Sequence, residues 1–345
     1  MKIAQIAPFE EAVPPKKYGG TERIVFYLTE ELVRRGHKVT LFATGDSKTS
    51  AKLFPVFPKA LRASKTNLDL KNRESYKFLG VVKIVTALKN KNFDIVHNHI
   101  GWRIIPFAPL IKSPLLTTLH GPLDIDYQRA IFKKFPRLPY VSISKSQRKP
   151  LPEINFVGNV YNGIDLKTFQ FNEKPKNYLA FLGRMSPEKG PVEAIKVAKM
   201  AKMKLIMAAK VDVVDREFFS KKVKPLIDGK QIKFIGEVGH KQKNKLLKEA
   251  KALVSPIKWR EPFGLFLTEA MACGTPVIAF RRGSIPEIIE DGKTGFIVNN
   301  VNEMAKAIQK IDRINRRECR KRVEENFSLE KMVDNYEKIY YQVIK

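Results

Sequence analysis

Two glutamates in the second half of the chain have the spacing and the setting of a nucleotide-binding site. Glu261 and Glu269 flank Gly264, where an apolar strand ending near Ser255 gives way to a helix. The opening of a helix binds phosphate through its amide N–H groups, and glycine allows close backbone approach. Glu269 therefore suits the paired hydroxyls of a ribose, and Glu261 the hydroxyls of the group beyond the phosphates. The alternative is that Glu261 is a surface loop residue and that Glu269 is a solvated position on the helix.

Two cations follow an earlier strand at the same kind of position. Arg184 and Lys189 come after the apolar run 178–182 and the intervening Gly183. Cations at the carboxyl end of a strand could neutralise a departing diphosphate, or could form a solvated pair. Lys210 ends the next strand, and it either adds a cation to the phosphate site or is exposed charge.

The first half of the chain adds a glycine pair and a histidine. Gly19 and Gly20 open a helix and would let the backbone approach a phosphate, unless they form a plain turn. His120 follows the apolar strand 115–119, where it either faces a ligand or packs in the core. His97 and His99 share one face of a strand, as metal ligands could, but no carboxylate or cysteine has matching spacing. A polar strand end is the favoured interpretation.

Together these motifs resemble those of the retaining glycosyltransferases of family 4. The pair Glu261 and Glu269 is similar to the E-x7-E signature of that family. Four further matches occur in the family's order, namely Gly19-Gly20, His120-Gly121, the segment 162–165 (Asn-Gly-Ile-Asp), and Gly183 with Arg184 and Lys189. The resemblance implies the GT-B architecture, an α/β fold with two Rossmann-like parallel-sheet domains that face an interdomain cleft.

The resemblance also implies a reaction and a role for each residue. The reaction is metal-independent transfer of a hexose, with retention, from a nucleoside diphosphate sugar to an acceptor hydroxyl. UDP-glucose is the first guess for the donor, and no cofactor is implied. The catalytic set is His120, Arg184, Lys189 and Glu261. The donor-binding set, in which Val238 belongs to the edge that holds the base, comprises Gly19, Gly20, Gly183, Lys210, Val238, Phe263, Gly264, Leu265 and Glu269.

Alternating strands and helices place these residues in two domains. The first, 1–165 with 329–345, is predicted to bind the acceptor, and the second, 176–328, the nucleotide sugar. Strands are expected at 3–7, 38–43, 95–97, 115–119, 140–143 and 156–161, then at 178–182, 204–208, 232–235, 252–255, 276–280 and 295–298. The longer helices are expected at 73–90, 124–135, 187–202, 214–228, 240–250, 264–272 and 302–325. A last helix, 329–344, carries Met332, Val333, Tyr336, Ile339 and Tyr340 on one face, which should return to the first domain.

Composition narrows the class of protein. Hydrophobic residues are 43% and charged residues 29% of 345, as in globular domains. Two cysteines exclude a disulfide framework. The start of the sequence lacks the features of a signal peptide, and no apolar run is long enough to span a bilayer, so a cytoplasmic protein is expected.

The charge balance favours anionic partners. Lys and Arg number 64 against 35 Asp and Glu, a net charge of +29. This charge either solvates the surface or attracts anions. Basic stretches at 71–91, 132–137 and 145–149 could contact the inner face of an anionic membrane, whereas no motif supports specific nucleic-acid binding. The alternatives kept open are a nucleotide-sugar epimerase or phosphorylase on the same fold, and a basic membrane- or nucleic-acid-binding protein. The acceptor remains undetermined, with loops 9–20, 55–75 and 99–110 predicted to bind it.

Overall fold

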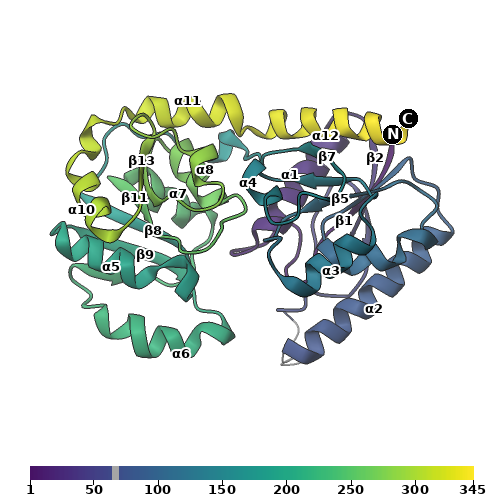
Figure 1. Ribbon diagram of the computed structural model, residues 1–345, viewed down its shortest axis with the longest axis horizontal. Coiled ribbons are helices and arrows are strands. Elements are labelled where there is room, and N and C mark those ends of the chain that lie inside the picture. Colours follow the sequence, from purple (N-terminus) through teal and green to yellow (C-terminus); the bar gives the residue numbers. More distant parts are fainter. Residues whose placement is uncertain (64–69) are drawn as a thin grey trace. The chain divides into compact units, whose positions relative to one another are not determined.

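The chain divides into two compact units. The computed structural model describes residues 1–63 and 70–345, so part of the predicted acceptor loop 55–75 lies outside the described residues. Unit 1 comprises Met1–Gly163 and Leu329–Lys345, and unit 2 comprises Ile164–Ser328 (Figure 1). The chain thus leaves unit 1 once and returns to it through its last helix.

Unit 1 is built on a seven-stranded parallel sheet in the order β3-β2-β1-β4-β5-β6-β7. The order reverses between β1 and β4, and such a switch point places the ends of these strands at a ligand-binding edge. The strands are β1 (Lys2–Ile6), β2 (Lys38–Ala43), β3 (Lys52–Pro55), β4 (Ile95–Asn98), β5 (Leu115–Leu119), β6 (Tyr140–Ser142) and β7 (Phe156–Asn159). The helices are α1 (Gly20–Arg34), α2 (Leu70–Lys89), α3 (Asp126–Lys134), α4 (Lys145–Arg148), α12 (Leu329–Ile344) and the 3-10 helix η1 (Gly101–Leu110).

Unit 2 is built on a six-stranded parallel sheet in the order β10-β9-β8-β11-β12-β13. The strands are β8 (Tyr178–Arg184), β9 (Lys204–Lys210), β10 (Ile232–Phe234), β11 (Ala252–Ser255), β12 (Val277–Phe280) and β13 (Gly295–Val298). The helices are α5 (Pro191–Met200), α6 (Arg216–Phe218), α7 (His240–Glu249), α8 (Leu265–Ala272), α9 (Ile285–Ile288), α10 (Val301–Gln309) and α11 (Arg316–Asn326). The two predicted parallel sheets are therefore confirmed.

Three predicted helices were wrong in extent. The helix expected at 187–202 is a 3-10 turn, Pro187–Lys189, followed by α5. Gly190 separates the two with a φ of 70°, and a Cβ atom there would lie 2.2 Å from the carbonyl oxygen of Pro256. The helix expected at 302–325 divides into α10 and α11, because Asn315 caps a new helix through its side chain. In place of the helix expected at 214–228, the chain forms a 3-10 turn, the short helix α6, one π turn and a second 3-10 turn.

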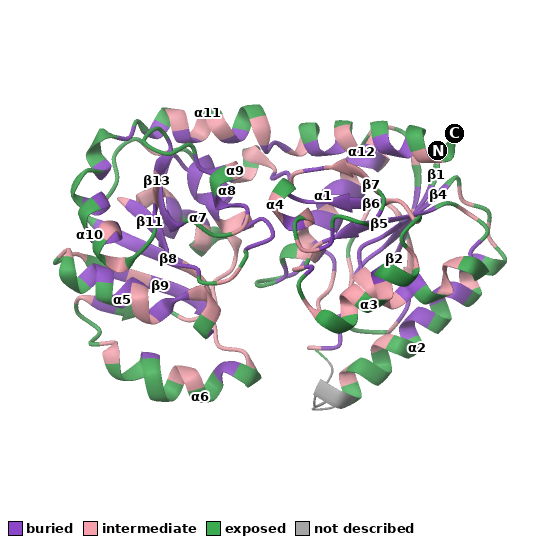
Figure 2. Ribbon diagram, viewed as in Figure 1, coloured by how far each residue is buried: buried purple, intermediate pink, exposed green. Residues whose placement is uncertain are grey.

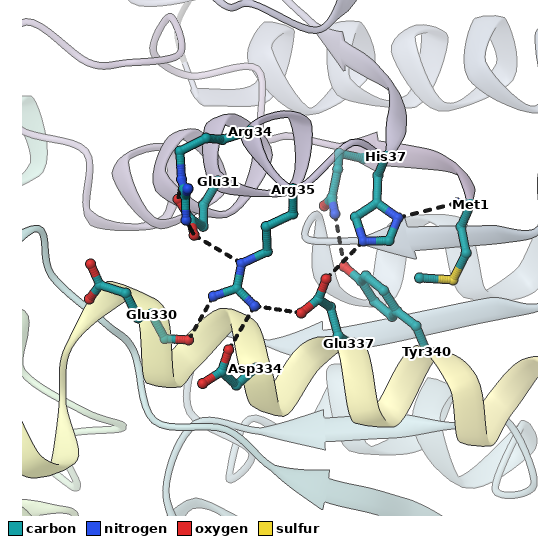
Figure 3. A network of polar contacts seen from close by, with 10 residues as sticks. Met1, Glu31, Arg34, Arg35, His37, Glu330, Asp334, Glu337 and Tyr340 are labelled. Carbon is teal, nitrogen blue, oxygen red and sulfur yellow. Dashed lines mark hydrogen bonds and ion pairs between the residues drawn. The ribbon is translucent and has the colours of Figure 1, made fainter.

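Helix α12 is fastened to unit 1 by charge as well as by apolar packing. Its five predicted core residues are all buried, as the buried side of the helix in Figure 2 shows. The Arg35 guanidinium lies 2.6 Å from Oδ1 of Asp334 and 2.5 Å from Oε2 of Glu337 (Figure 3). Nε2 of His37 lies 2.8 Å from the other oxygen of Glu337. The last helix is therefore joined to the end of α1 and the start of β2.

Candidate active site

In unit 2, the structure brings Lys189 and Glu261 together. β8 and β11 are neighbours in the sheet, so the segments that follow them meet at one edge. Nζ of Lys189 lies 2.5 Å from Oε2 of Glu261, and the indole N–H of Trp259 donates to the same oxygen at 2.9 Å. The Lys189 ammonium also lies 4.9 Å from the Trp259 ring centroid. Glu261 is buried, so it is not a solvated loop residue.

The start of α8 lies directly beyond this pair. Gly264 occupies the N-cap position with a φ of 86°, and no side chain among the described residues caps the helix there. The amide-rich end of the helix is thus available to an anion. Phe263 before it is buried, whereas Leu265, the first helical residue, is half-buried.

A neighbouring loop holds this helix start in position. Ser284 donates its backbone N–H to the Glu261 carbonyl at 2.9 Å and its hydroxyl to the Phe263 carbonyl at 2.8 Å. A Cβ atom on Gly283 would lie 2.3 Å from the Glu261 carbonyl oxygen. This contact requires glycine, so the segment 281–284 has a structural role beside the candidate site.

Glu269 has a partner that sequence reasoning missed. Its carboxylate is buried inside α8 and forms an ion pair with the Lys243 ammonium of α7. Lys243 also lies 5.6 Å from the ring centroid of Phe169. The alternative of a solvated helix position is therefore wrong. The Glu269 carboxylate is thus held in place by a lysine from the neighbouring helix.

Arg184, the last residue of β8, is also paired with carboxylates. It contacts Glu188 one turn later, and its Nε lies 3.0 Å from Oδ2 of Asp215. Burial raises the pKa of Asp215 although the arginine opposes that shift. Lys210, at the end of β9, lies 3.5 Å from Asp212, so the alternative of free exposed charge does not describe it. The site cations of unit 2 are all held by carboxylates.

The two remaining predicted residues of unit 2 are Gly183, which pairs with Ala209 of β9, and Val238. A Cβ atom on Gly183 would meet nothing within 4 Å, so the backbone beside Arg184 borders open space. Val238 lies half-buried in the loop between β10 and α7. Neither residue lies in the group formed by Lys189 and Glu261.

In unit 1, the glycine pair lies at the start of α1. Gly19 has a φ of 136°, and a Cβ atom there would lie 2.7 Å from the Pro15 side chain. Glycine is therefore required at this position. Burial raises the pKa of Glu22, in the first turn of the helix, to about 7. A carboxyl group that is largely protonated below pH 7 would repel an approaching anion much less than a carboxylate would.

His120 belongs to a chain of buried hydrogen bonds. Its Nε2 lies 2.9 Å from Nδ1 of His99, whose Nε2 lies 2.8 Å from Oε1 of Gln5. Nε2 of Gln5 in turn donates to the Tyr340 hydroxyl of α12 at 2.9 Å. Figure 3 shows this tyrosine pointing from α12 into unit 1. The chain connects the last helix with the end of β5.

The order of donors fixes the tautomers. Burial lowers the pKa of His99 well below its ordinary value and that of His120 to about 4, so both rings are neutral. Oε1 of Gln5 can only accept, so Nε2 of His99 donates to it and Nδ1 of His99 accepts. His120 must then donate through Nε2, which leaves its Nδ1 as an acceptor. An imidazole in this state can accept a hydrogen bond from a hydroxyl group.

The histidine pair considered for metal binding has other partners. Nδ1 of His97 lies 2.7 Å from the Tyr340 hydroxyl, and Nε2 lies 2.7 Å from the Thr118 hydroxyl. Both nitrogens of His99 are bonded as described above. Within residues 1–63 and 70–345, no three His, Cys, Asp or Glu side chains are grouped so that they could hold a metal ion.

Sequence reasoning missed the residues that hold the site residues in place. Trp259 is two residues before Glu261, and its proximity was the one available signal. Lys243, Asp215 and Gln5 gave no signal, because each is remote in sequence from the residue it contacts. Tyr340 was predicted to pack against the first domain, but its hydrogen bond to Gln5 was not.

Family matches over both units define this protein as a GT-B glycosyltransferase. Residues 164–328 match the family described as Glycosyl transferases group 1, and residues 18–167 match Glycosyltransferase Family 4. The chain belongs to glycosyltransferase family 4, whose members transfer a sugar from a nucleotide-sugar donor.

Similar proteins cover nearly the same length. An uncharacterised glycosyltransferase of Methanocaldococcus jannaschii is 28% identical over 77% of this chain and 82% of its own. Sucrose-phosphate synthase of Thermosynechococcus elongatus has a TM-score of 0.83 at 21% identity over 99% and 98% of the chains. HepE of Anabaena, solved with UDP-glucose, has a TM-score of 0.73 at 17% identity over 99% of each chain. These two structures share the fold of this chain.

Among the described residues, no helix combines the length and the apolar composition that crossing a bilayer requires.

Proposed function

We propose that this enzyme transfers a hexose, with retention and without a metal ion, from a UDP-sugar to an acceptor hydroxyl. The observation that carries the proposal is the meeting of Lys189 and Glu261 beside the uncapped start of α8. A cation, a carboxylate and a helix N-terminus at one point suit a sugar diphosphate, since the first and last bind phosphate and the carboxylate accepts from sugar hydroxyls. UDP-glucose is the donor to test first, because HepE holds it on the same fold.

The two units bind different substrates in the proposed reaction. Unit 2 binds the donor: Arg184, Lys189 and the start of α8 hold the diphosphate, Lys210 adds charge beside it, and Glu269 takes the ribose hydroxyls. The loop that contains Val238 borders the base. Unit 1 receives the acceptor, and Nδ1 of its His120 is the acceptor nitrogen that a sugar hydroxyl would use.

The transfer step needs only groups that the enzyme and its substrates supply. The bond between the anomeric carbon and the diphosphate oxygen breaks, and the acceptor oxygen forms a bond on the same face of the sugar. The departing phosphate oxygen takes the acceptor proton. The cations stabilise the charge that develops on the diphosphate, which is worth several kcal/mol in sites of this kind. The sugar passes through a state like an oxocarbenium ion.

Two alanine variants test the site. Arg184→Ala should lower kcat at least about 100-fold, because it removes charge stabilisation at the leaving group. Glu269→Ala should raise the KM for the donor more than it lowers kcat, since it removes a binding contact. Lys221→Ala, at an exposed ion pair with Glu217 of the same unit, is the control. If both site variants retain wild-type rates with the preferred donor, the site assignment is wrong.

Product analysis separates this reaction from its alternatives. The anomeric configuration of the product, read by proton NMR, should match that of the donor. A donor incubated without acceptor should not form an epimer, as it would with an epimerase. Adding inorganic phosphate should not release a sugar phosphate, as it would with a phosphorylase.

A further inference from the structure

Three large apolar side chains of α2 are exposed among its polar residues. Its inner side packs Val81, Ile84, Val85 and Leu88 into the core of unit 1. Outside this buried stripe, Phe78, Leu79 and Val82 expose 58, 58 and 40% of their surface. Figure 2 shows exposed and buried segments alternating along α2. Single exposed apolar residues are ordinary. Three of them close together on one helix indicate a surface that binds a protein, a membrane or a ligand.

The neighbouring elements η1 and α3 carry further exposed apolar side chains. η1 packs against both α2 and α3. The rings of Phe78 and Phe107 lie 6.2 Å apart, which joins α2 to η1. Leu110, three residues along η1, is 51% exposed, and Tyr127 of α3 is 58% exposed with its ring 5.8 Å from that of Trp102. We call the six residues Phe78, Leu79, Val82, Phe107, Leu110 and Tyr127 the outer patch.

The charge of the same elements is strongly positive. Among the described residues of 72–91, 101–112 and 126–137, the exposed cations are Lys83, Lys89, Lys112, Lys133, Lys134 and Arg137. The exposed carboxylates there are Glu74, which is already paired with Lys77 and Arg103, and Asp126, which lies 3.8 Å from Arg129. One of the cations, Lys133, is paired with Glu153. Exposed cations therefore outnumber exposed carboxylates on the segments that carry the outer patch.

We propose that the outer patch docks this enzyme on the surface of an anionic lipid bilayer. Apolar side chains on a basic face can enter the headgroup region while the lysines attract acidic lipids. A second copy of the chain fits less well, because two faces with the same excess of positive charge repel each other. A nucleic acid would satisfy the charge but leave the aliphatic members of the patch, Leu79, Val82 and Leu110, without a partner.

This proposal does not depend on the sugar-transfer reaction. Binding to a bilayer can be measured without donor or acceptor. A failure of the active-site assignment would therefore leave it standing, and a failure to bind lipid would leave the transferase proposal standing.

The test is flotation of the full-length enzyme with vesicles. Vesicles of phosphatidylcholine with phosphatidylglycerol should carry the enzyme to the top of the gradient at low salt. High salt should weaken binding, because salt screens the charge. Vesicles of phosphatidylcholine alone should bind at least about tenfold less, since they offer no acidic lipid to the basic residues.

Two pairs of variants test where binding occurs. The double variant Phe78→Ser and Leu79→Ser should lose at least about tenfold in affinity, because two large side chains no longer enter the headgroup region. The control is Val213→Ser with Val214→Ser in unit 2, two adjacent apolar residues that are 58 and 57% exposed. This control should bind like the wild type. Thermal melting of both pairs checks that the fold is intact.

A charge pair distinguishes lipid from the other partners. Lys89→Glu with Lys112→Glu should lose vesicle binding, whereas Lys306→Glu with Lys310→Glu, which are exposed on and after α10, should lose much less. The proposal is overturned if the wild type does not float with anionic vesicles, or if each control loses as much as its test pair. It is also overturned if the patch variants reduce binding to polyuridylate, or self-association in sedimentation, and leave vesicle binding unchanged.

Discussion

At the scale of single residues, the candidate site is already neutralised by its own side chains. Lys189 contacts Glu261, Arg184 contacts Glu188 and Asp215, and Lys243 contacts Glu269. In the proposed reaction, a diphosphate would therefore compete with carboxylates for the cations. Breaking such pairs costs free energy, and an anion that forms two or more charge-assisted hydrogen bonds can offset that cost.

The pair formed by Lys243 and Glu269 gives a test of stability. Lys243→Met leaves the Glu269 carboxylate buried without its partner, and we expect a loss of about 3 kcal/mol in the free energy of unfolding. The KM for the donor should also rise, since the carboxylate loses its orientation. Chemical denaturation and steady-state kinetics measure the two effects.

The control for this variant has the same chemistry at the surface. Lys221→Met removes an ion pair with Glu217 in which both side chains are mostly exposed, and it should change stability by less than about 0.5 kcal/mol. Equal losses in the two variants would contradict the role given to Lys243.

Glu22 gives a prediction about pH. Its pKa is raised from 4.5 to about 7 in the folded protein, so the folded state binds more protons than the unfolded chain between these values. Folding stability must therefore fall as pH rises through this window. Glu22→Gln should be more stable than the wild type above pH 7, by up to about 3 kcal/mol, and should match it near pH 4. Unfolding curves across this range test the prediction, and an advantage that does not depend on pH would contradict it.

At the scale of elements, α12 packs against unit 1 and also takes part in the hydrogen bonds that reach His120. Through Tyr340, Gln5 and His99 it fixes which nitrogen of His120 carries the proton. An element at the end of the chain thereby sets the chemistry of a loop after β5. Helix α12 also shows what the sequence can predict, because its bounds and its buried face both follow from helical periodicity.

Tyr340→Phe tests this connection. The variant removes the hydroxyl that Gln5 donates to, so the amide can reverse and the tautomer of His99 can change. We expect kcat to fall several-fold with the donor KM unchanged, because His120 would lose its acceptor nitrogen. Nitrogen-15 NMR of the histidine rings should show a changed tautomer, which a loss of packing alone would not cause.

The matched control lies on the same helix. Tyr341→Phe removes a hydroxyl from a residue that is 55% exposed, and it should leave kcat and the histidine signals unchanged. If Tyr340→Phe also leaves them unchanged, α12 does not govern His120.

Other elements show where local pattern reaches its limit. Strands β2, β11 and β13 have the bounds that apolar runs predict. The helix expected at 187–202 breaks at Gly190 because that residue packs against Pro256, which is remote in sequence. Strand β3 was not predicted, since it is short, half-exposed and pairs only at the sheet edge. Hydrophobic periodicity predicts which side of a segment is buried. It does not predict which residues, distant in sequence, the segment will contact.

At the scale of the whole molecule, family motifs indicated the two sheets and the residues of each unit. They did not reveal the partners of those residues, because charge pairs such as Lys189 with Glu261 join segments that are 72 residues apart. The excess of positive charge was evident from composition alone. Its concentration beside exposed apolar residues on α2, η1 and α3 required the structure.

The second unit is connected to the first by two chain segments that meet. Ile164 and Ser328 form a parallel bridge, and the backbone N–H of Ile164 donates to the Phe327 carbonyl at 3.0 Å. Because the first and last residues of unit 2 pair with each other, the unit can be replaced by a related domain whose two ends lie equally close together. Chimeras that replace residues 164–328 with the matching piece of another family member should keep both partners' folds and inherit the sugar preference of the inserted piece.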